Sequence, residues 1–78
     1  GMNDVWLPIM SNYGDDFYEL YIYNRWGQLL FKSNDPNVGW DGTFNGKLLE
    51  AGVYVYAVGY HNLMGKLIKR EGTITLIR

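Results

Sequence analysis

The sequence predicts a small all-β fold, an antiparallel β-sandwich of the immunoglobulin or fibronectin sort. Ten glycines are spread along 78 residues, so few helix-length stretches escape a residue that is costly inside a helix. Short segments of aromatic and β-branched residues alternate with turn signals instead. Aromatic residues make up 17% of the chain, which supplies large side chains for the core of a domain this small.

The first expected strand covers residues 2–9, at a sheet edge, and ends near Pro8. We interpret Gly1 as the remnant of an expression tag, so that a single domain spans residues 2–78.

A β-hairpin is predicted next. Residues 17–23 are dense in strand formers, and their alternation places Leu20 and Ile22 on one face. Residues 24–27 read as a tight turn that begins at an asparagine and ends at a glycine. Residues 28–32 then form the returning strand.

Residues 34–39 are rich in turn formers and predict a loop, and residues 40–42 and 45–46 add further turn signals. Residues 53–60 are the clearest strand. Both faces of that strand are apolar, which predicts a central strand covered on both sides. Gly59 is expected to mark a bulge within it.

Residues 61–65 are expected to form a hairpin loop, followed by a last strand or strand pair over residues 66–70 and 72–77. Ile74 and Leu76 fall on one face of this final segment.

The sequence offers little for catalysis. The one histidine, His61, is expected to be a loop residue, and Ser33 has no nucleophile-elbow setting. Asp15, Asp16 and Asp35 are interpreted as solvated turn residues, with a carboxylate pair as the alternative. The absence of cysteine excludes disulfides and thiolate metal sites. We therefore predict no enzyme and no cofactor, although a weak Ca²⁺ site of loop oxygens stays open.

The charge and hydropathy of the chain limit the classes of partner that we expect. A net charge of −1 gives no broad positive field of the kind that nucleic acid or an anionic membrane would select, so neither is expected as a partner. No apolar run approaches the roughly 20 residues needed to span a bilayer, so no membrane insertion is expected. No signal peptide is visible, and an exported protein would therefore carry this chain as one piece of something longer.

Trp26 and Trp40 each stand beside glycines in predicted turns. An exposed pair could stack on sugar rings, as in a carbohydrate-binding module. We favour packing at the end of the sandwich for both, with the indole N–H groups hydrogen-bonded.

Five motifs together resemble a known family. In order they are Asn-Asp-Val-Trp at 3–6, Tyr-Asn-Arg-Trp-Gly at 23–27, Gly-Trp-Asp-Gly-Thr-Phe-Asn-Gly-Lys at 39–47, Ala-Gly-Val-Tyr-Val-Tyr at 51–56 and Gly-Thr-Ile-Thr-Leu-Ile-Arg at 72–78. This order resembles the gliding motility-associated C-terminal domain of Bacteroidetes, the type B sorting domain of the type IX secretion system. The combination of Trp-Asp-Gly with the later Gly-Val-Tyr-Val-Tyr is less specific than the full set of motifs. A similar combination also occurs in the immunoglobulin-like domain of flagellar hook-capping proteins.

The resemblance implies a C-terminal module of a larger protein. Protein components of the secretion machinery would bind it in the periplasm, and its carrier would pass to the cell surface or the medium. The ending after a predicted strand suits a natural C-terminus.

The chain departs from the family pattern at its N-terminal end. Family members carry a Thr-Pro-Asn-Gly-Asp-Gly-like stretch before the Asn-Asp pair, and it is absent here. The chain is therefore expected to lack the first strand of the sandwich. The unpaired edge would invite pairing with another chain, so a dimer formed there would be a product of truncation.

The candidate recognition patch consists of Asn24, Arg25, Trp26, Gly27, Trp40, Asp41 and Gly42. That these residues only shape turns stays an alternative. A carbohydrate-binding module and an immunoglobulin-like structural spacer stay alternatives for the whole domain.

Overall fold

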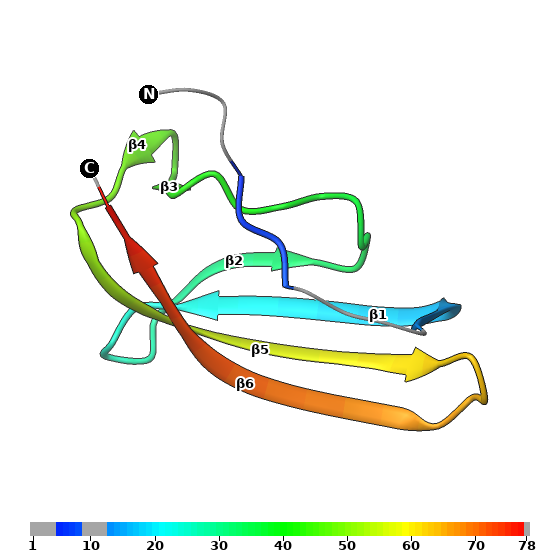
Figure 1. Cartoon of the computed structure of the whole chain (residues 1–78). Helices are drawn as coiled ribbons and strands as arrows, with labels where there is room; N and C mark the ends of the chain where they lie inside the picture. Colours follow the sequence, from blue (N-terminus) through cyan, green and yellow to red (C-terminus); the bar gives the residue numbers. More distant parts are fainter. Residues whose placement is uncertain (1–4, 9–12, 78) are drawn as a thin grey trace.

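The larger layer of the molecule is a four-stranded antiparallel sheet in the order β2-β1-β5-β6 (Figure 1). The computed structural model describes residues 5–8 and 13–77, and none of these is helical. The sheet strands are β1 (Tyr13–Tyr23), β2 (Leu29–Ser33), β5 (Gly52–Asn62) and β6 (Leu67–Leu76). A separate small hairpin consists of β3 (Thr43–Phe44) and β4 (Lys47–Leu48). The predicted all-β antiparallel fold class is confirmed.

One face of the sheet carries the core. Successive side chains of a strand point to opposite faces, so every second residue of β1 and β5 is directed inward. Leu20 and Ile22 are fully buried in this way, as predicted, and Ile74 of β6 joins them. Among the residues that the structure describes, the buried core consists of Tyr18, Leu20, Ile22, Trp40, Tyr54, Val58, Tyr60 and Ile74.

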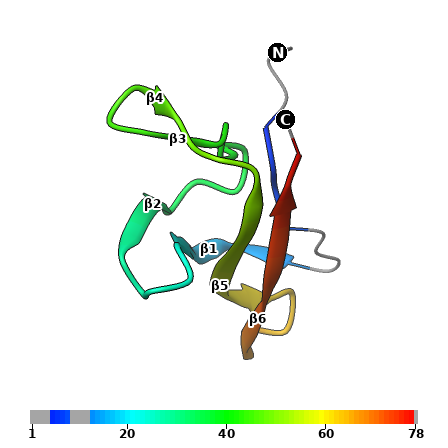
Figure 2. The ribbon, with the colours of Figure 1, turned by 90° about the vertical axis from the view of Figure 1, so that its left-hand side faces the viewer.

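The second layer is the chain between β2 and β5, together with residues 5–8. In Figures 1 and 2 this chain crosses over the inner face of the sheet on its way to the β3–β4 hairpin. Trp6 and Trp40 form a two-residue bridge, with the Trp6 amide donating to the Trp40 carbonyl at 2.6 Å and the reverse bond at 2.9 Å. The Trp6 ring also lies 4.8 Å from that of Tyr56 of β5. Residues from three distant parts of the chain thus close the top of the core.

The prediction that the strand over residues 53–60 is covered on both sides is wrong. β5 is central, as predicted, but Val53 is 53% exposed and Val55 is exposed beside it. The ladder pairs Val55 with Tyr23 on one side and with Thr73 on the other. Cross-strand contacts of this kind favour β-branched residues even on a sheet face that no second layer covers. The apolar pattern of residues 53–60 therefore predicted more burial than the structure shows.

The expected bulge at Gly59 is also wrong. Gly59 pairs with Glu19 and with Lys69 in an unbroken register. The irregularities lie in β1 instead, between Tyr13 and Tyr18 and again between Ile22 and Tyr23.

The other strands begin or end a few residues away from the predicted positions. The strands predicted over residues 17–23 and 28–32 are confirmed, with β1 beginning earlier and β2 shifted by one residue. The predicted loop over residues 61–65 is shorter, because His61 and Asn62 belong to β5. The last segment is one continuous strand, β6, with Ile74 and Leu76 on the core side. Of the edge strand predicted over residues 2–9, the described residues 5–8 contain only the Trp6 bridge, and the rest lies outside the described residues.

Candidate functional site

A rigid turn joins β1 to β2. The Gly27 amide donates to the Asn24 carbonyl at 3.0 Å, and the Asn24 amide donates to the Gln28 carbonyl at 3.0 Å. The side-chain oxygen of Asn24 accepts two more bonds, from the amides of Trp26 (3.0 Å) and Gln28 (2.9 Å). Gly27 has φ 89°, in the region where a Cβ is penalised. The predicted turn is confirmed, and the asparagine side chain fixes its shape.

Trp26 stands at the tip of this turn with 78% of its surface exposed. The packing role predicted for Trp26 is therefore wrong. The guanidinium carbon of Arg25 lies 4.6 Å from the centroid of its ring, within the range of a cation–π contact. This contact limits the orientations of an indole that faces solvent.

A groove of about 430 Å³ opens beside the turn. Arg25, Trp26 and Leu30 line one side of it. Phe44 and Leu48 of the β3–β4 hairpin line the other side, and the chain from residue 49 to residue 54 completes it. The groove thus lies between two hairpins and is lined by polar as well as apolar residues.

Trp40 has the opposite environment. It is 2% exposed, and its ring meets that of Tyr54 edge-on, with centroids 5.4 Å apart. The indole Nε1 donates to the Thr43 carbonyl at 3.1 Å. The packing role predicted for Trp40, with its N–H hydrogen-bonded, is confirmed.

Asp41 and Gly42 shape the base of the β3–β4 hairpin. A side-chain oxygen of Asp41 accepts from the Thr43 amide at 3.1 Å and from the Thr43 hydroxyl at 2.6 Å. Gly42 has φ 80°, and its carbonyl accepts from the Leu49 amide at 3.0 Å. These contacts fix the hairpin that forms the far wall of the groove.

The predicted patch therefore divides into two parts. Asn24, Arg25 and Trp26 line the groove, with Gly27 in the same turn. Trp40, Asp41 and Gly42 do not line it, and they support the hairpin opposite.

Sequence reasoning missed Phe44 and Leu48, which line the groove from the β3–β4 hairpin. A signal for them was present. Asn45 (φ 53°) and Gly46 (φ 79°) form the Asn-Gly pair that favours a two-residue hairpin turn.

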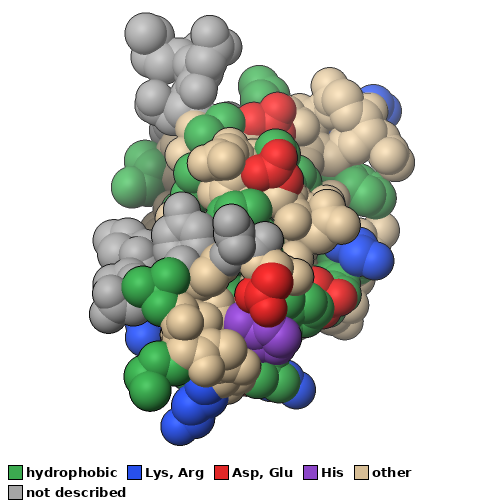
Figure 3. Space-filling view, turned by 90° about the vertical axis from the view of Figure 1, so that its right-hand side faces the viewer, with side chains coloured by type: hydrophobic (Ala, Val, Ile, Leu, Met, Phe, Trp, Pro, Cys, Tyr) green, Lys and Arg blue, Asp and Glu red, His purple; other side chains and the backbone are tan. Residues whose placement is uncertain are grey.

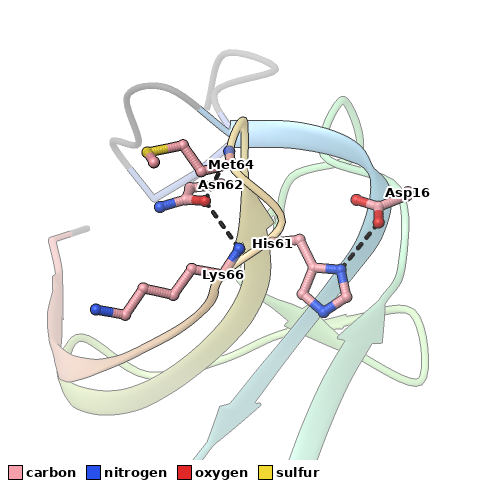
Figure 4. A network of polar contacts seen from close by, with 5 residues as sticks. All are labelled: Asp16, His61, Asn62, Met64 and Lys66. Carbon is pink, nitrogen blue, oxygen red and sulfur yellow. Dashed lines mark hydrogen bonds and ion pairs between the residues drawn. The ribbon is translucent and has the colours of Figure 1, made fainter.

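His61 has a partner that the sequence did not suggest. Its Nδ1 lies 3.0 Å from Oδ2 of Asp16, at the start of the sheet (Figure 4). The hydrogen bond to His61 lowers the pKa of the exposed Asp16 carboxyl below its ordinary value. His61 is thus a strand residue and not the predicted loop residue, whereas Asp16 is solvated, as predicted, but lies in a strand and not in a turn. This pair lies at the opposite end of β5 from the groove.

Ser33 and Asp35 form hydrogen bonds with nearby backbone groups. The Ser33 hydroxyl exchanges hydrogen bonds with the backbone of Asp35, and the Asp35 carboxylate accepts from the Asn37 amide at 2.8 Å. The turn role predicted for Asp35 is confirmed. Among residues 5–8 and 13–77, no three His, Cys, Asp or Glu side chains come together in a group that could hold a metal ion. The same residues contain no helix long and apolar enough to cross a membrane.

Comparison with known proteins gives one result. The family model described as CHU_C Type IX secretion signal domain matches residues 1–76. No curated protein and no solved structure matches the chain significantly. The match covers nearly the whole chain and agrees with the resemblance of its motifs to a gliding motility-associated sorting domain. The chain therefore belongs to the CHU_C type IX secretion signal domain family, whose members are sorting modules for export through the type IX secretion system.

Proposed function

We propose that a protein component of the type IX secretion machinery binds this domain at the Asn24 turn and the groove beside it, and that the domain itself catalyses no reaction. The observation that carries this proposal is the exposure of Trp26, 78% of whose surface faces solvent beside a groove with a mixed polar and apolar lining. Tryptophan is among the residues most often found at the centre of protein interfaces. With so little of its surface buried, Trp26 contributes little to the core.

The surroundings of Trp26 suit a protein partner. The turn below it is closed by four hydrogen bonds, so little ordering is required when a partner binds. Leu48 on the opposite wall is also exposed, and the two side chains could hold an apolar side chain of the partner between them. Arg25 and Glu50 supply one charge of each sign along the groove.

The proposed route follows from the family. The carrier protein would enter the periplasm, where the machinery would bind the folded domain and move the carrier to the cell surface or the medium. Such an address requires a folded surface and no reacting group. The proposal therefore assigns Trp40, Asp41 and Gly42 to holding the groove wall in place.

The test is an export assay with single substitutions. The domain is fused to a periplasmic reporter in a Bacteroidetes host, and the reporter is measured inside and outside the cells. Trp26→Ala is expected to leave most of the reporter in the periplasm, while Val38→Ala, an exposed apolar residue outside the groove, leaves export unchanged. Equal export of the Trp26→Ala and wild-type fusions would contradict this site.

A further inference from the structure

The turn between β5 and β6 presents apolar side chains to solvent at the tip of the hairpin. Met64 is 91% exposed and Leu63 is 71% exposed, and Leu67 follows them at the start of β6. Figure 4 shows the Met64 side chain directed to the opposite side of the hairpin from the His61–Asp16 pair. Leu63 and Met64 therefore contribute little to the core of the described residues.

One basic residue lies in this turn, and two more follow in β6. Residues 61–70 hold Lys66, Lys69 and Arg70 and no Asp or Glu, whereas the rest of the chain carries four basic and eight acidic residues. The charge of this hairpin is therefore opposite in sign to that of the remaining chain. Figure 3 shows Lys and Arg side chains together with hydrophobic ones at the lower end of the molecule, below the histidine, and acidic side chains directly above the histidine.

Two acidic groups nearby offset part of this charge. Asp16 is hydrogen-bonded to His61, and Glu71 directly follows Arg70 in β6. Both Lys69 and Arg70 are exposed, and so is Lys66 in the turn. Figure 4 shows the Lys66 side chain extending to the same side as Met64.

Four hydrogen bonds hold the backbone of the turn at this tip. The side-chain oxygen of Asn62 accepts from the amides of Met64 and Lys66, each at 2.9 Å. The Gly65 amide donates to the Asn62 carbonyl at 2.9 Å, and the Asn62 amide donates to the Lys66 carbonyl at 2.9 Å. A loop can enter the apolar margin of a bilayer only if such groups have partners, because lipid offers none.

We propose that this tip, Leu63, Met64 and Leu67 with the basic residues Lys66, Lys69 and Arg70, docks on the surface of an anionic phospholipid bilayer. The two apex side chains enter the boundary between head groups and acyl chains. The three basic groups stay at the level of the lipid phosphates, which attract them. The domain lies on the membrane and does not span it.

Two features favour a bilayer over a protein as the occupant. The apex is convex, so it needs a soft or concave counterpart, and a lipid interface adapts to any convex shape. The charge of the hairpin also complements an anionic surface, while the opposite end of the sheet carries the Trp26 groove assigned to a protein partner. The two surfaces lie at opposite ends of the sheet in Figure 1. The inference is independent of the proposed protein-binding role of the groove.

The test is flotation of the chain with vesicles of phosphatidylcholine, with and without about one-third phosphatidylglycerol. We expect the chain to float with the anionic vesicles and not with the neutral ones. Raising the salt from about 0.05 M to about 0.5 M should weaken binding, because it screens the basic groups. Leu63→Ser and Met64→Ser should each weaken it about tenfold.

The matched control is Leu48→Ser, which removes an equally exposed leucine from the β3–β4 hairpin and should leave flotation unchanged. Thermal unfolding of each variant shows that the fold is intact. Failure of the wild-type chain to float, or equal loss in Leu48→Ser and Met64→Ser, would overturn the proposal. If the chain does not float but Met64→Ser blocks export of a fused reporter, the tip contacts a protein and the lipid proposal is wrong.

Discussion

Asn24 and Asn62 hold their hairpins in the same way. Each side-chain oxygen accepts from the amides two and four residues later, at 2.9–3.0 Å, and each residue's carbonyl accepts from the glycine three residues later. The glycines, Gly27 and Gly65, have φ of 89° and 78°. The Asn-x-x-Gly spacing therefore builds the same rigid turn at both ends of the sheet, and in both cases the third residue of the turn faces solvent.

The first prediction concerns these two asparagines. Asn24→Ala and Asn62→Ala should each lower the free energy of unfolding by about 1–2 kcal/mol, because two backbone amides lose their acceptor. Urea unfolding measures this change. Asn37→Ala, an exposed loop asparagine, is the control and should have little effect. A loss confined to one of the two turns would contradict their equivalence.

The second prediction separates the two tryptophans. Trp40→Phe should lower the free energy of unfolding by about 2 kcal/mol, because it removes buried ring volume and the bond from Nε1 to the Thr43 carbonyl. Trp26→Phe should stay within about 0.5 kcal/mol of wild type, because its ring is exposed. Similar losses in the two variants, measured by urea unfolding, would be incompatible with the positions described.

The third prediction tests the bridge between residues 6 and 40. A Cβ at Gly39 would lie 2.7 Å from the carbonyl oxygen of Trp6, a backbone atom that cannot move aside alone. Gly39→Ala should therefore cost about 1–3 kcal/mol of stability. Gly59→Ala is the matched control, since a Cβ there meets nothing closer than 3.9 Å. If urea unfolding gives equal values for the two variants, Trp6 does not lie where the structure places it.

The fourth prediction concerns acid. The pKa of Asp16 is lower in the folded chain than its ordinary value of 3.8, chiefly because of the hydrogen bond with His61. A lowered folded-state pKa contributes stability that is present above 3.8 and is lost as the pH falls through the folded value. The wild-type chain should thus lose its small advantage over Asp16→Asn below about pH 4. Thermal unfolding of both chains from about pH 6 to pH 3 measures it, and parallel curves would contradict the pairing.

The strands could be predicted because their signals are local. Alternation in residues 17–23 identified the buried face of β1 through Leu20 and Ile22, and the Asn24 turn followed from its asparagine and glycine. Burial of the outer face could not be predicted in this way. Val53 and Val55 look like core residues, but whether a second layer covers them depends on contacts distant in sequence.

The same limit applied to the site. Trp26 and Trp40 have similar neighbours in the sequence, with a glycine close by each, yet one faces solvent and the other fills the core. The difference arises from the Trp6–Trp40 bridge and the contact with Tyr54, both of which join distant residues. The pairing of Asp16 with His61 likewise depends on the register between β1 and β5, which no local pattern encodes.

The central claim is that this domain directs export, and reporter localisation tests it most directly. Residues 1–78 are fused to the end of a periplasmic reporter in a Bacteroidetes host, and the reporter is quantified in the medium, at the cell surface and in the periplasm. We predict that it leaves the cell in a strain with an intact type IX secretion system and stays in the periplasm in a strain without one. Retention of the folded fusion in the periplasm of both strains would contradict the account.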